Sequence, residues 1–411
     1  MKNVKNIFLI FYALIPLSAY QFSIGIGISL DRILLPLVLI LVLTLRFDKV
    51  HGLLTVLFLL FSSSVFSILF SNSYEWVGFY KLGPSWFQSI IVFVFSVLVA
   101  EKFGEFWVRR IFLLNLLVLF FFACYGFWYR YILDDVNVIY PFSSYLPDLL
   151  DNKHKWTMLY HKRLFFPFSS APRLGFVAGF LTIYYIFFSP ETRRRFFFVA
   201  ASLFILIVTI SRGPMLSLFL SIFLVLVFTN FYRGRFFPLL ISTIFISVLF
   251  VLIGYVDLSD SSKFERLFSL SAEDESLQGH LGIRLRVLNL VFNNSVVNMF
   301  FGYGLGQTEP LLNVSSAHSS YFTQLFEQGL FGIFSYALVY LLILRNAWLL
   351  YKVKPSRRAL GLFVLAVYLT LIHFAYDAIS MVILWAYNGL VWGLINFEKK
   401  YGEYKCRGSM L

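Results

Sequence analysis

The sequence predicts an all-α, polytopic integral membrane protein with about 12 transmembrane helices. Apolar residues make up 59% of the 411 residues, and only 13% are charged. Apolar runs of roughly 20 residues recur along the whole chain, and each is long enough to cross a hydrocarbon core of about 30 Å. Lys and Arg also concentrate in alternate connections between these runs, which is typical of a multi-pass protein.

The chain 1–411 is expected to form a single membrane domain. Two connections, 131–173 and 257–319, are too long to be simple turns, and connections of this length are usually functional or disordered. We expect both to be ordered loops on the outer face of the membrane, with the second loop carrying the candidate catalytic residues. The expected spans cover 6–26, 29–46, 52–70, 84–100, 111–130, 174–189, 196–211, 213–230, 236–256, 320–344, 359–377 and 380–397.

The distribution of charge sets the expected orientation. With the N-terminus inside, the inner segments hold 21 of the 34 Lys and Arg residues but only 6 of the 21 acids. Because basic residues stay on the cytoplasmic side, both termini should lie in the cytoplasm. The net charge of +13 therefore anchors the inner face, and it does not indicate nucleic-acid binding, because the chain lacks a soluble basic domain. Cys124 and Cys406 are not expected to pair, because they fall in a span and in the inner tail.

The second outer loop contains an expected amphipathic helix at 281–301. Its apolar stripe would rest on the outer leaflet or on the spans, with Arg284 facing the protein and Arg286 facing water. The sequence GYGLG at 302–306 should stop this helix, and Gly302 and Gly304 would permit either a close approach to a ligand or a plain tight turn. The residues of the stripe are Leu281, Leu285, Leu288, Val291 and Phe292.

Three outer residues are candidates for chemistry. Arg212 stands between two spans that almost touch, Arg284 lies on the surface helix, and His318 opens the tenth span. With Ser319 or Ser320 as N-cap, the helix N-terminus would disfavour an imidazolium, so His318 should be neutral and able to accept a proton.

Each candidate also has a structural interpretation. Arg212 could contact lipid headgroups, and Arg284 could pair with an acid at 273–275. His318 could be an interfacial histidine, and Glu327 could bond to a neighbouring span.

Two arginines and one neutral histidine suit transfer from a lipid-linked diphosphate. Guanidinium groups can hold a pyrophosphate through bidentate, charge-assisted bonds, and an imidazole can remove the proton from a sugar hydroxyl. The hydroxyl would then attack the anomeric carbon from the face opposite the phosphate and invert its configuration. We expect no metal and no cofactor, because the arginines would stabilise the leaving group and the chain has no Asp-x-Asp motif.

Four segments carry a resemblance to a known family. SRGPML (211–216), GIRLRVL (282–288), FFGYGLG (300–306) and HSSYFTQLFEQGLFG (318–332) resemble the signature segments of the O-antigen ligase and polymerase family. In the last segment, His318, Ser319, Gly329 and Gly332 fit the pattern of the ligases. The resemblance covers roughly residues 175–345 and none of the first five spans, and Leu288 stands where some members carry Trp.

The resemblance implies a metal-independent, inverting glycosyltransferase on the periplasmic face of the bacterial inner membrane. Its donor would be an undecaprenyl-pyrophosphate-linked glycan, and its acceptor a glycan or a lipid-linked glycan within the lipid bilayer. Arg212 and Arg284 would bind the pyrophosphate, and His318 would act on the acceptor hydroxyl. The supporting residues would be Arg286, Glu327, Gly302 and Gly304.

Four functions stay open, and a purely structural or binding role is one of them. A repeat-unit polymerase is favoured, because the 131–173 loop carries basic residues that could hold a second anionic substrate, although these could also contact lipid headgroups. A polymerase would also be expected to work with a chain-length regulator protein. An O-antigen ligase, which passes polymer to the lipid A core, is the alternative within the family. A transporter or flippase is the alternative of another class, and His373 with Asp377 is its best indication.

Overall fold

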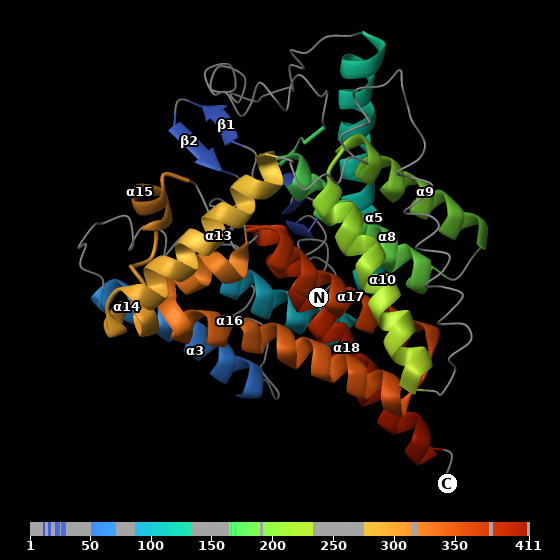
Figure 1. Cartoon of the computed structure of the whole chain (residues 1–411). Helices are drawn as coiled ribbons and strands as arrows, with labels where there is room; N and C mark the ends of the chain where they lie inside the picture. The colour runs from blue at the N-terminus through green and yellow to red at the C-terminus, as the bar shows by residue number, and fades with distance from the viewer. Residues whose placement is uncertain are drawn as a thin grey trace. The chain divides into compact units, whose positions relative to one another are not determined.

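The computed structural model shows a mainly helical chain in two compact units, each described by itself (Figure 1). Unit 1 comprises residues 1–31 and 111–271, and unit 2 comprises 32–110 and 272–411. The spans expected at 29–46 and 236–256 and most of the 131–173 loop lie outside the described residues. The structure describes residues 11–12, 15–17, 21–24, 26–29, 51–70, 87–133, 164–165, 167–168, 170–189, 192–232, 275–314, 317, 319–377 and 381–408.

Unit 1 is built around the helix α8 (Ala171–Phe188), which packs against α9 (Thr192–Val208) and α10 (Arg212–Tyr232). A tight turn joins α9 to α10, with Ile210 at φ 47°. A Cβ on Gly175 would lie 2.8 Å from Pro214 Cγ, so the absence of a side chain there lets α8 approach α10 closely. The other elements are η1 (Ile15–Leu17), β1 (Gln21–Ile24), β2 (Ile26–Ser29), the second part of α5 (Gln88–Phe127) and the π-helix η3 (Trp128–Ile132).

The β-hairpin corrects the predicted first span. The antiparallel strands β1 and β2 pair Gln21 with Ser29 and Ile24 with Ile26, where the hydropathy predicts the end of a helix at 6–26. Alternation of β-branched Ile with Gly between residues 24 and 28 lowers helix propensity, and the strand pairing satisfies the backbone groups instead.

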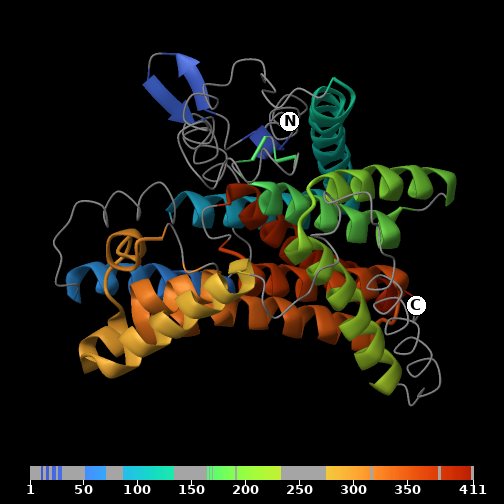
Figure 2. The ribbon, with the colours of Figure 1, turned by 45° about the horizontal axis from the view of Figure 1, so that its top comes forward.

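Unit 2 contains a set of long helices with a smaller helical layer against them (Figure 2). The long helices are α3 (His51–Phe70), the first part of α5, α16 (Ser320–Val353), α17 (Arg357–Ala375) and α18 (Val382–Gly408). The smaller layer is α13 (Glu275–Asn293), α14 (Val296–Phe301) and α15 (Thr308–Leu312), and all three contact α16.

The expected inner loop at 101–110 is helical. α5 joins the spans predicted at 84–100 and 111–130, and only Gly104, at φ 68° and ψ −168°, departs from helical geometry. The sequence EKFGEFWVRR contains no proline and several good helix formers, so the charged stretch continues the helix on both sides of the glycine.

α16 is a helical hairpin, which corrects the continuous span expected at 320–344. Gly329, at φ 65° and ψ −160°, divides it into a first arm, Ser320–Gln328, and a second arm, Leu330–Val353. In a straight helix, residues 15 or 16 positions apart would be separated by about 22–24 Å. Instead, the rings of Tyr321 and Tyr336 have centroids 5.4 Å apart, and Ser320 Oγ and Tyr336 Oη both lie within 3.0 Å of His373 Nδ1. The first arm therefore folds back along the second.

Five of the described helices are long and apolar enough to cross a membrane. They are Gln88–Phe127, Ala171–Phe188, Arg212–Asn230, Ser320–Val353 and Arg357–Ala375. Leu57–Phe70 of α3 forms a shorter apolar helix. These helices support a multi-pass membrane protein.

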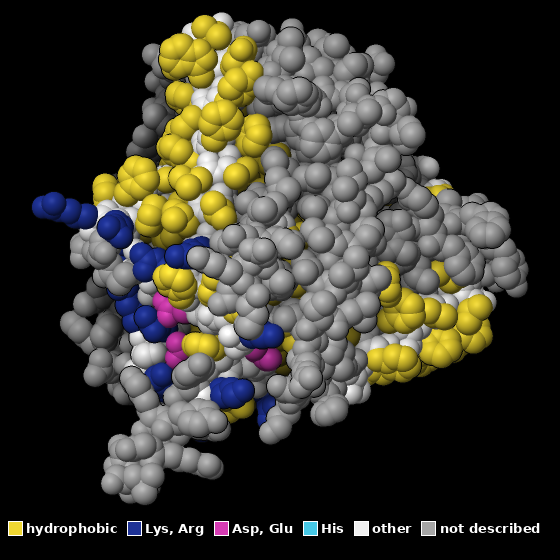
Figure 3. Space-filling model, turned by 180° about the vertical axis from the view of Figure 1, so that it is seen from behind, with side chains coloured by type: hydrophobic (Ala, Val, Ile, Leu, Met, Phe, Trp, Pro, Cys, Tyr) yellow, Lys and Arg dark blue, Asp and Glu magenta, His cyan; other side chains and the backbone are white. Residues whose placement is uncertain are grey.

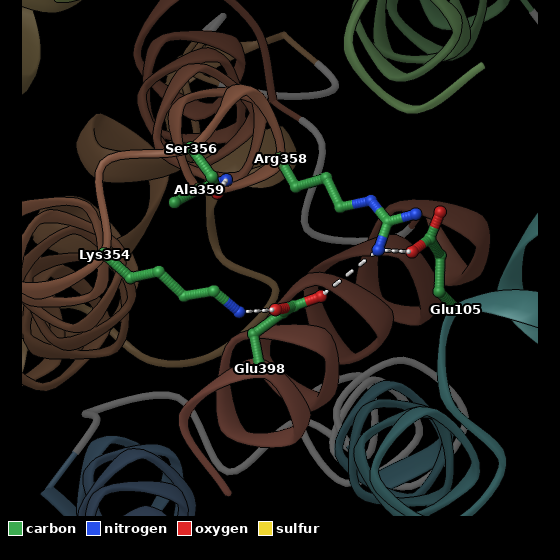
Figure 4. Close-up of polar contacts among 6 residues, drawn as sticks. All are labelled: Glu105, Lys354, Ser356, Arg358, Ala359 and Glu398. Atoms are coloured by element: carbon green, nitrogen blue, oxygen red, sulfur yellow. Dashed lines mark hydrogen bonds and ion pairs between the residues drawn. The ribbon is translucent and has the colours of Figure 1, made fainter. Parts of the chain in front are cut away.

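One end of unit 2 carries a network of ion pairs. Arg358 Nη1 lies 2.9 Å from Glu105 Oε2 and 3.9 Å from Glu398 Oε1, and Lys354 Nζ lies 3.1 Å from Glu398 Oε2 (Figure 4). Ser356 caps α17 by accepting from the backbone N–H of Ala359 at 3.1 Å. Lys and Arg side chains also gather around acidic ones on the face shown in Figure 3. This basic end of α17 is opposite the end that carries His373.

Candidate functional site

Arg284 lies where α13 meets the start of α16 and the end of α17. Its guanidinium carbon is 5.5 Å from the ring centroid of Phe322 and 5.6 Å from that of Phe374, and its Nη2 donates to the Phe374 carbonyl at 3.3 Å. Half-burial lowers the pKa of this guanidinium, because desolvation disfavours the charged form. An arginine remains charged at neutral pH despite such a shift, so Arg284 places an oriented cation at this junction.

Some of the other side chains of α13 pack against the protein, and others are exposed. Val287 and Val291 are buried in an apolar cluster with Leu325 and Phe326 of α16. Arg286 is exposed and donates to the Leu311 carbonyl at 3.4 Å. The expected orientations of Arg284 and Arg286 are thus confirmed. Part of the predicted stripe, however, does not rest on the described protein, since these members stay exposed: Leu281, Leu285 and Phe292.

The last residues of α17 and the two that follow, 373–377, are here called the α17 terminus, and they hold the first turn of α16. The His373 carbonyl accepts from Ser319 Oγ at 3.2 Å, and the Tyr376 carbonyl accepts from the Ser320 N–H at 3.2 Å. Thr323 Oγ1 donates to Asp377 Oδ2 at 3.0 Å. Since the Phe374 carbonyl also accepts from Arg284, this short segment joins Arg284 to the beginning of α16.

The Gly-x-Gly segment packs against the turn of the α16 hairpin. Gly302, at φ 77°, ends α14 where the expected 281–301 helix should stop, but that helix is divided into α13, which ends at Asn293, and α14, which begins at Val296. The residues after Gly302 turn toward α16. The N–H groups of Tyr303 and Gly304 donate to the carbonyls of Phe326 and Glu327 at 2.9 and 3.1 Å. A helix break leaves carbonyl groups without partners from their own helix, and these two bonds satisfy them. The close approach permitted by the glycines is therefore made to the protein backbone.

A buried polar group surrounds this turn. Glu327 accepts from Thr308 Oγ1 at 2.7 Å, and Gln328 Oε1 accepts from Ser63 Oγ at 2.7 Å. Ser67 Oγ donates to the Glu327 carbonyl. Within the described part of the chain, both polar atoms of the Gln324 side chain and Gln328 Nε2 have no hydrogen-bond partner. The polar run before Gly329 was a signal in the sequence for this feature, because lipid-facing helix surfaces rarely carry it.

Two candidate residues, His318 and Arg212, cannot be placed relative to Arg284 and the helix junction. His318 lies outside the described residues, although its neighbours Ala317 and Ser319 are both buried. Arg212 begins α10 in unit 1 and is half-buried. A helix N-terminus is a favourable place for an anion.

The structure also identifies a residue that the sequence had linked only to Asp377. His373 is fully buried in unit 2, and its Nδ1 lies 3.0 Å from Ser320 Oγ and 2.7 Å from Tyr336 Oη. Among the described residues, no group of three or more His, Cys, Asp or Glu side chains could hold a metal ion. The described site is therefore an arginine beside a hydrogen-bonded helix junction.

Several apolar helices of membrane length support a multi-pass membrane protein, and the polar junction of α13, α16 and α17 is its candidate site. Residues 196–337 match the family model described as O-Antigen ligase. This segment includes all four motifs quoted above, so this part of the chain is similar to that family. A comparison with curated proteins gave no match.

Proposed function

We propose that the chain transfers a glycan from undecaprenyl pyrophosphate to a sugar hydroxyl at the outer face of the bacterial inner membrane. The match of residues 196–337 to the O-antigen ligase model carries this proposal, because it contains Arg212, Arg284 and His318. No metal takes part in the proposed reaction. The proposed orientation is supported by α17, which has basic residues at its start and the Arg284 junction at its end.

In the proposed reaction Arg284 binds the diphosphate of the donor, and Arg212 contributes a second cation. The rings of Phe322 and Phe374 and the Phe374 carbonyl restrict the Arg284 guanidinium, so less conformational entropy is lost on binding. Charge-assisted bonds from arginine would stabilise the negative charge that develops on the leaving group.

His318 is the proposed base. It takes the proton of the acceptor hydroxyl, whose oxygen forms the new bond to the anomeric carbon. The bond between that carbon and the phosphate oxygen breaks, and its electron pair leaves with undecaprenyl pyrophosphate. Attack from the opposite face inverts the anomeric configuration.

The proposed base is tested by His318→Ala. We expect glycan transfer to be lost while the amount of protein in the membrane fraction stays normal. Thr370→Ala in α17 is a suitable control, because Thr370 Oγ1 bonds only within its own helix in the contacts described, at 2.9 Å to the Ala366 carbonyl. Full transfer by the His318 variant would reject the assignment of the base.

Within this chemistry we favour a repeat-unit polymerase, on the basis of the basic residues of the 131–173 segment. A ligase is the second candidate, because the matching family model is described as a ligase and His318 fits the ligase pattern. Deletion followed by gel analysis of glycans separates them. A single repeat unit on the lipid core would indicate a polymerase, and polymer accumulating on the undecaprenyl carrier would indicate a ligase. Repeat units retained at the inner face would instead indicate a flippase.

A further inference from the structure

We propose that His373 is a positioning residue for the transfer reaction, which holds the first arm of the α16 hairpin in register with the α17 terminus. This inference rests on the proposed function. His373 would fix the position of Ser320, and with it the position of the chain that follows His318. Through its own helix, it would keep that segment in register with the carbonyl that orients Arg284.

The α17 terminus contacts both Arg284 and the beginning of α16. The Phe374 carbonyl accepts from Arg284 Nη2 at 3.3 Å, and the His373 carbonyl accepts from Ser319 Oγ at 3.2 Å. A shift of α17 along its axis would change both contacts together. A side chain of α17 that bonds to both arms of α16 adds a further constraint on this register.

The His373 side chain connects α17 to both arms of the α16 hairpin. Its Nδ1 lies within hydrogen-bonding distance of Ser320 in the first arm and Tyr336 in the second arm, on either side of the Gly329 turn. The ring also packs against Tyr340, with centroids 4.7 Å apart. One buried imidazole thus bridges α17 and both arms of the hairpin.

An apolar residue at position 373 would pack as well but would not fix the positions of the arms. The surroundings of His373 are fully buried, and an apolar side chain of similar volume would satisfy hydrophobic packing. Hydrogen bonds to buried partners are directional, so they fix the rotation and the axial position of the arms where apolar contacts tolerate sliding. His373 Nε2 has no hydrogen-bond partner among the described residues, so the bridge depends on Nδ1.

The test uses the full-length protein in lipid nanodiscs and the lipid-linked glycan isolated from a host strain that lacks the chain. We expect His373→Ala to lower kcat per folded protein about tenfold or more, since small misplacements of reacting groups have effects of this order. His373→Asn puts an amide near the position of Nδ1 and should recover activity to within about threefold of wild type. Thr370→Ala, three residues away on α17, should leave kcat unchanged.

A second measurement keeps the inference testable if His373→Ala fails to fold. Ser320→Ala removes the same contact from the other side and should lower kcat by a similar factor. Because the two residues act as one unit, the double variant Ser320→Ala with His373→Asn should lose no more activity than Ser320→Ala alone. Wild-type kcat in folded His373→Ala, or independent losses in the double variant, would overturn the inference.

Amide hydrogen exchange examines the contact without any substrate. Residues 319–324 should exchange faster in His373→Ala than in wild type, and at the wild-type rate in Thr370→Ala. If wild type transfers no glycan but the exchange difference is present, the glycosyltransferase proposal fails and the bridge stands. If wild type transfers glycan and His373→Ala changes neither exchange nor kcat, the positioning role fails and the glycosyltransferase proposal stands.

Discussion

Gly302 and Gly329 each pack against the backbone that precedes the other. A Cβ on Gly302 would lie 2.4 Å from the carbonyl group of Glu327, and a Cβ on Gly329 would lie 2.4 Å from the carbonyl carbon of Phe300. Both residues also have positive φ, at 77° and 65°. This reciprocal contact joins the end of α14 to the turn of the α16 hairpin.

Substitution of either glycine by alanine should therefore destabilise unit 2. The Cβ would overlap backbone atoms, which cannot move aside as a flexible side chain can, and a positive φ adds strain. We expect each change to cost about 1–3 kcal/mol or more. Thermal unfolding in detergent, followed by intrinsic fluorescence, should show a lower midpoint for Gly329→Ala and for Gly302→Ala.

Gly282→Ala provides the matched control in α13. A Cβ there has no heavy atom within 4 Å among its described surroundings, and Gly282 is helical. Alanine in an exposed helix is favoured over glycine by about 0.5–1 kcal/mol, so this variant should unfold at the same temperature or a higher one. An equal loss of stability in Gly282→Ala and Gly329→Ala would contradict the close contact.

Replacement of Arg284 by lysine should impair transfer even though the charge is kept. An ammonium group cannot form the planar, bidentate contact with a diphosphate, and it stacks less well between Phe322 and Phe374. We expect a loss of about tenfold or more for Arg284→Lys and on the order of a hundredfold for Arg284→Ala. Initial rates at several donor concentrations would measure both.

Arg357→Lys serves as the control for this series, because Arg357 is exposed at the basic end of α17. Its transfer rate should match that of wild type. Wild-type activity in Arg284→Lys would show that the position needs only a positive charge.

Transfer should persist after chelation. If arginines stabilise the leaving group, removal of divalent cations with EDTA should leave the initial rate within about twofold of its starting value. The measurement is the rate of product formation in dialysed nanodiscs before and after EDTA. Loss of activity that returns on addition of Mg²⁺ or Mn²⁺ would reject the arginine-only mechanism.

The ion pairs at the basic end of α17 should contribute little to stability. The Arg358 side chain is 54% exposed, and solvent screens its attraction to Glu105. A double-mutant cycle with Arg358→Gln and Glu105→Gln should give a coupling energy of about 0.2–1 kcal/mol. A coupling well above this range would mean that the pair is shielded from water.

Much of unit 2 could be predicted from local sequence. The apolar runs predicted α3 and α17, and Gly302 ended its helix where expected. The placement of Arg284 toward the protein and Arg286 toward water followed from helical periodicity. These features depend on residues that are close together in the sequence, so hydropathy and helical periodicity are enough to predict them.

The α16 hairpin and the role of His373 depend on distant residues. Apolar sequence continues on both sides of Gly329, and single glycines also occur within straight membrane helices. The turn becomes favourable only because residues 302–304 supply donors to the carbonyls that it frees. Likewise, His373 and Ser320 are 53 residues apart, and no local pattern indicates that their side chains meet.

The serines of α3 bear on how the chain assembles during translation. Ser63 Oγ lies 2.8 Å from the Leu60 carbonyl of its own helix and 2.7 Å from Oε1 of Gln328, which is made 265 residues later. At ribosomal speeds that interval is on the order of tens of seconds. A hydroxyl has one proton, and before Gln328 is synthesised it can be donated to the Leu60 carbonyl, so the Ser63 donor is satisfied within α3 itself. Once Gln328 has been synthesised and packs against α3, Ser63 can donate the same proton to Gln328 Oε1. A hydrogen bond within α3 is then exchanged for one between α3 and α16.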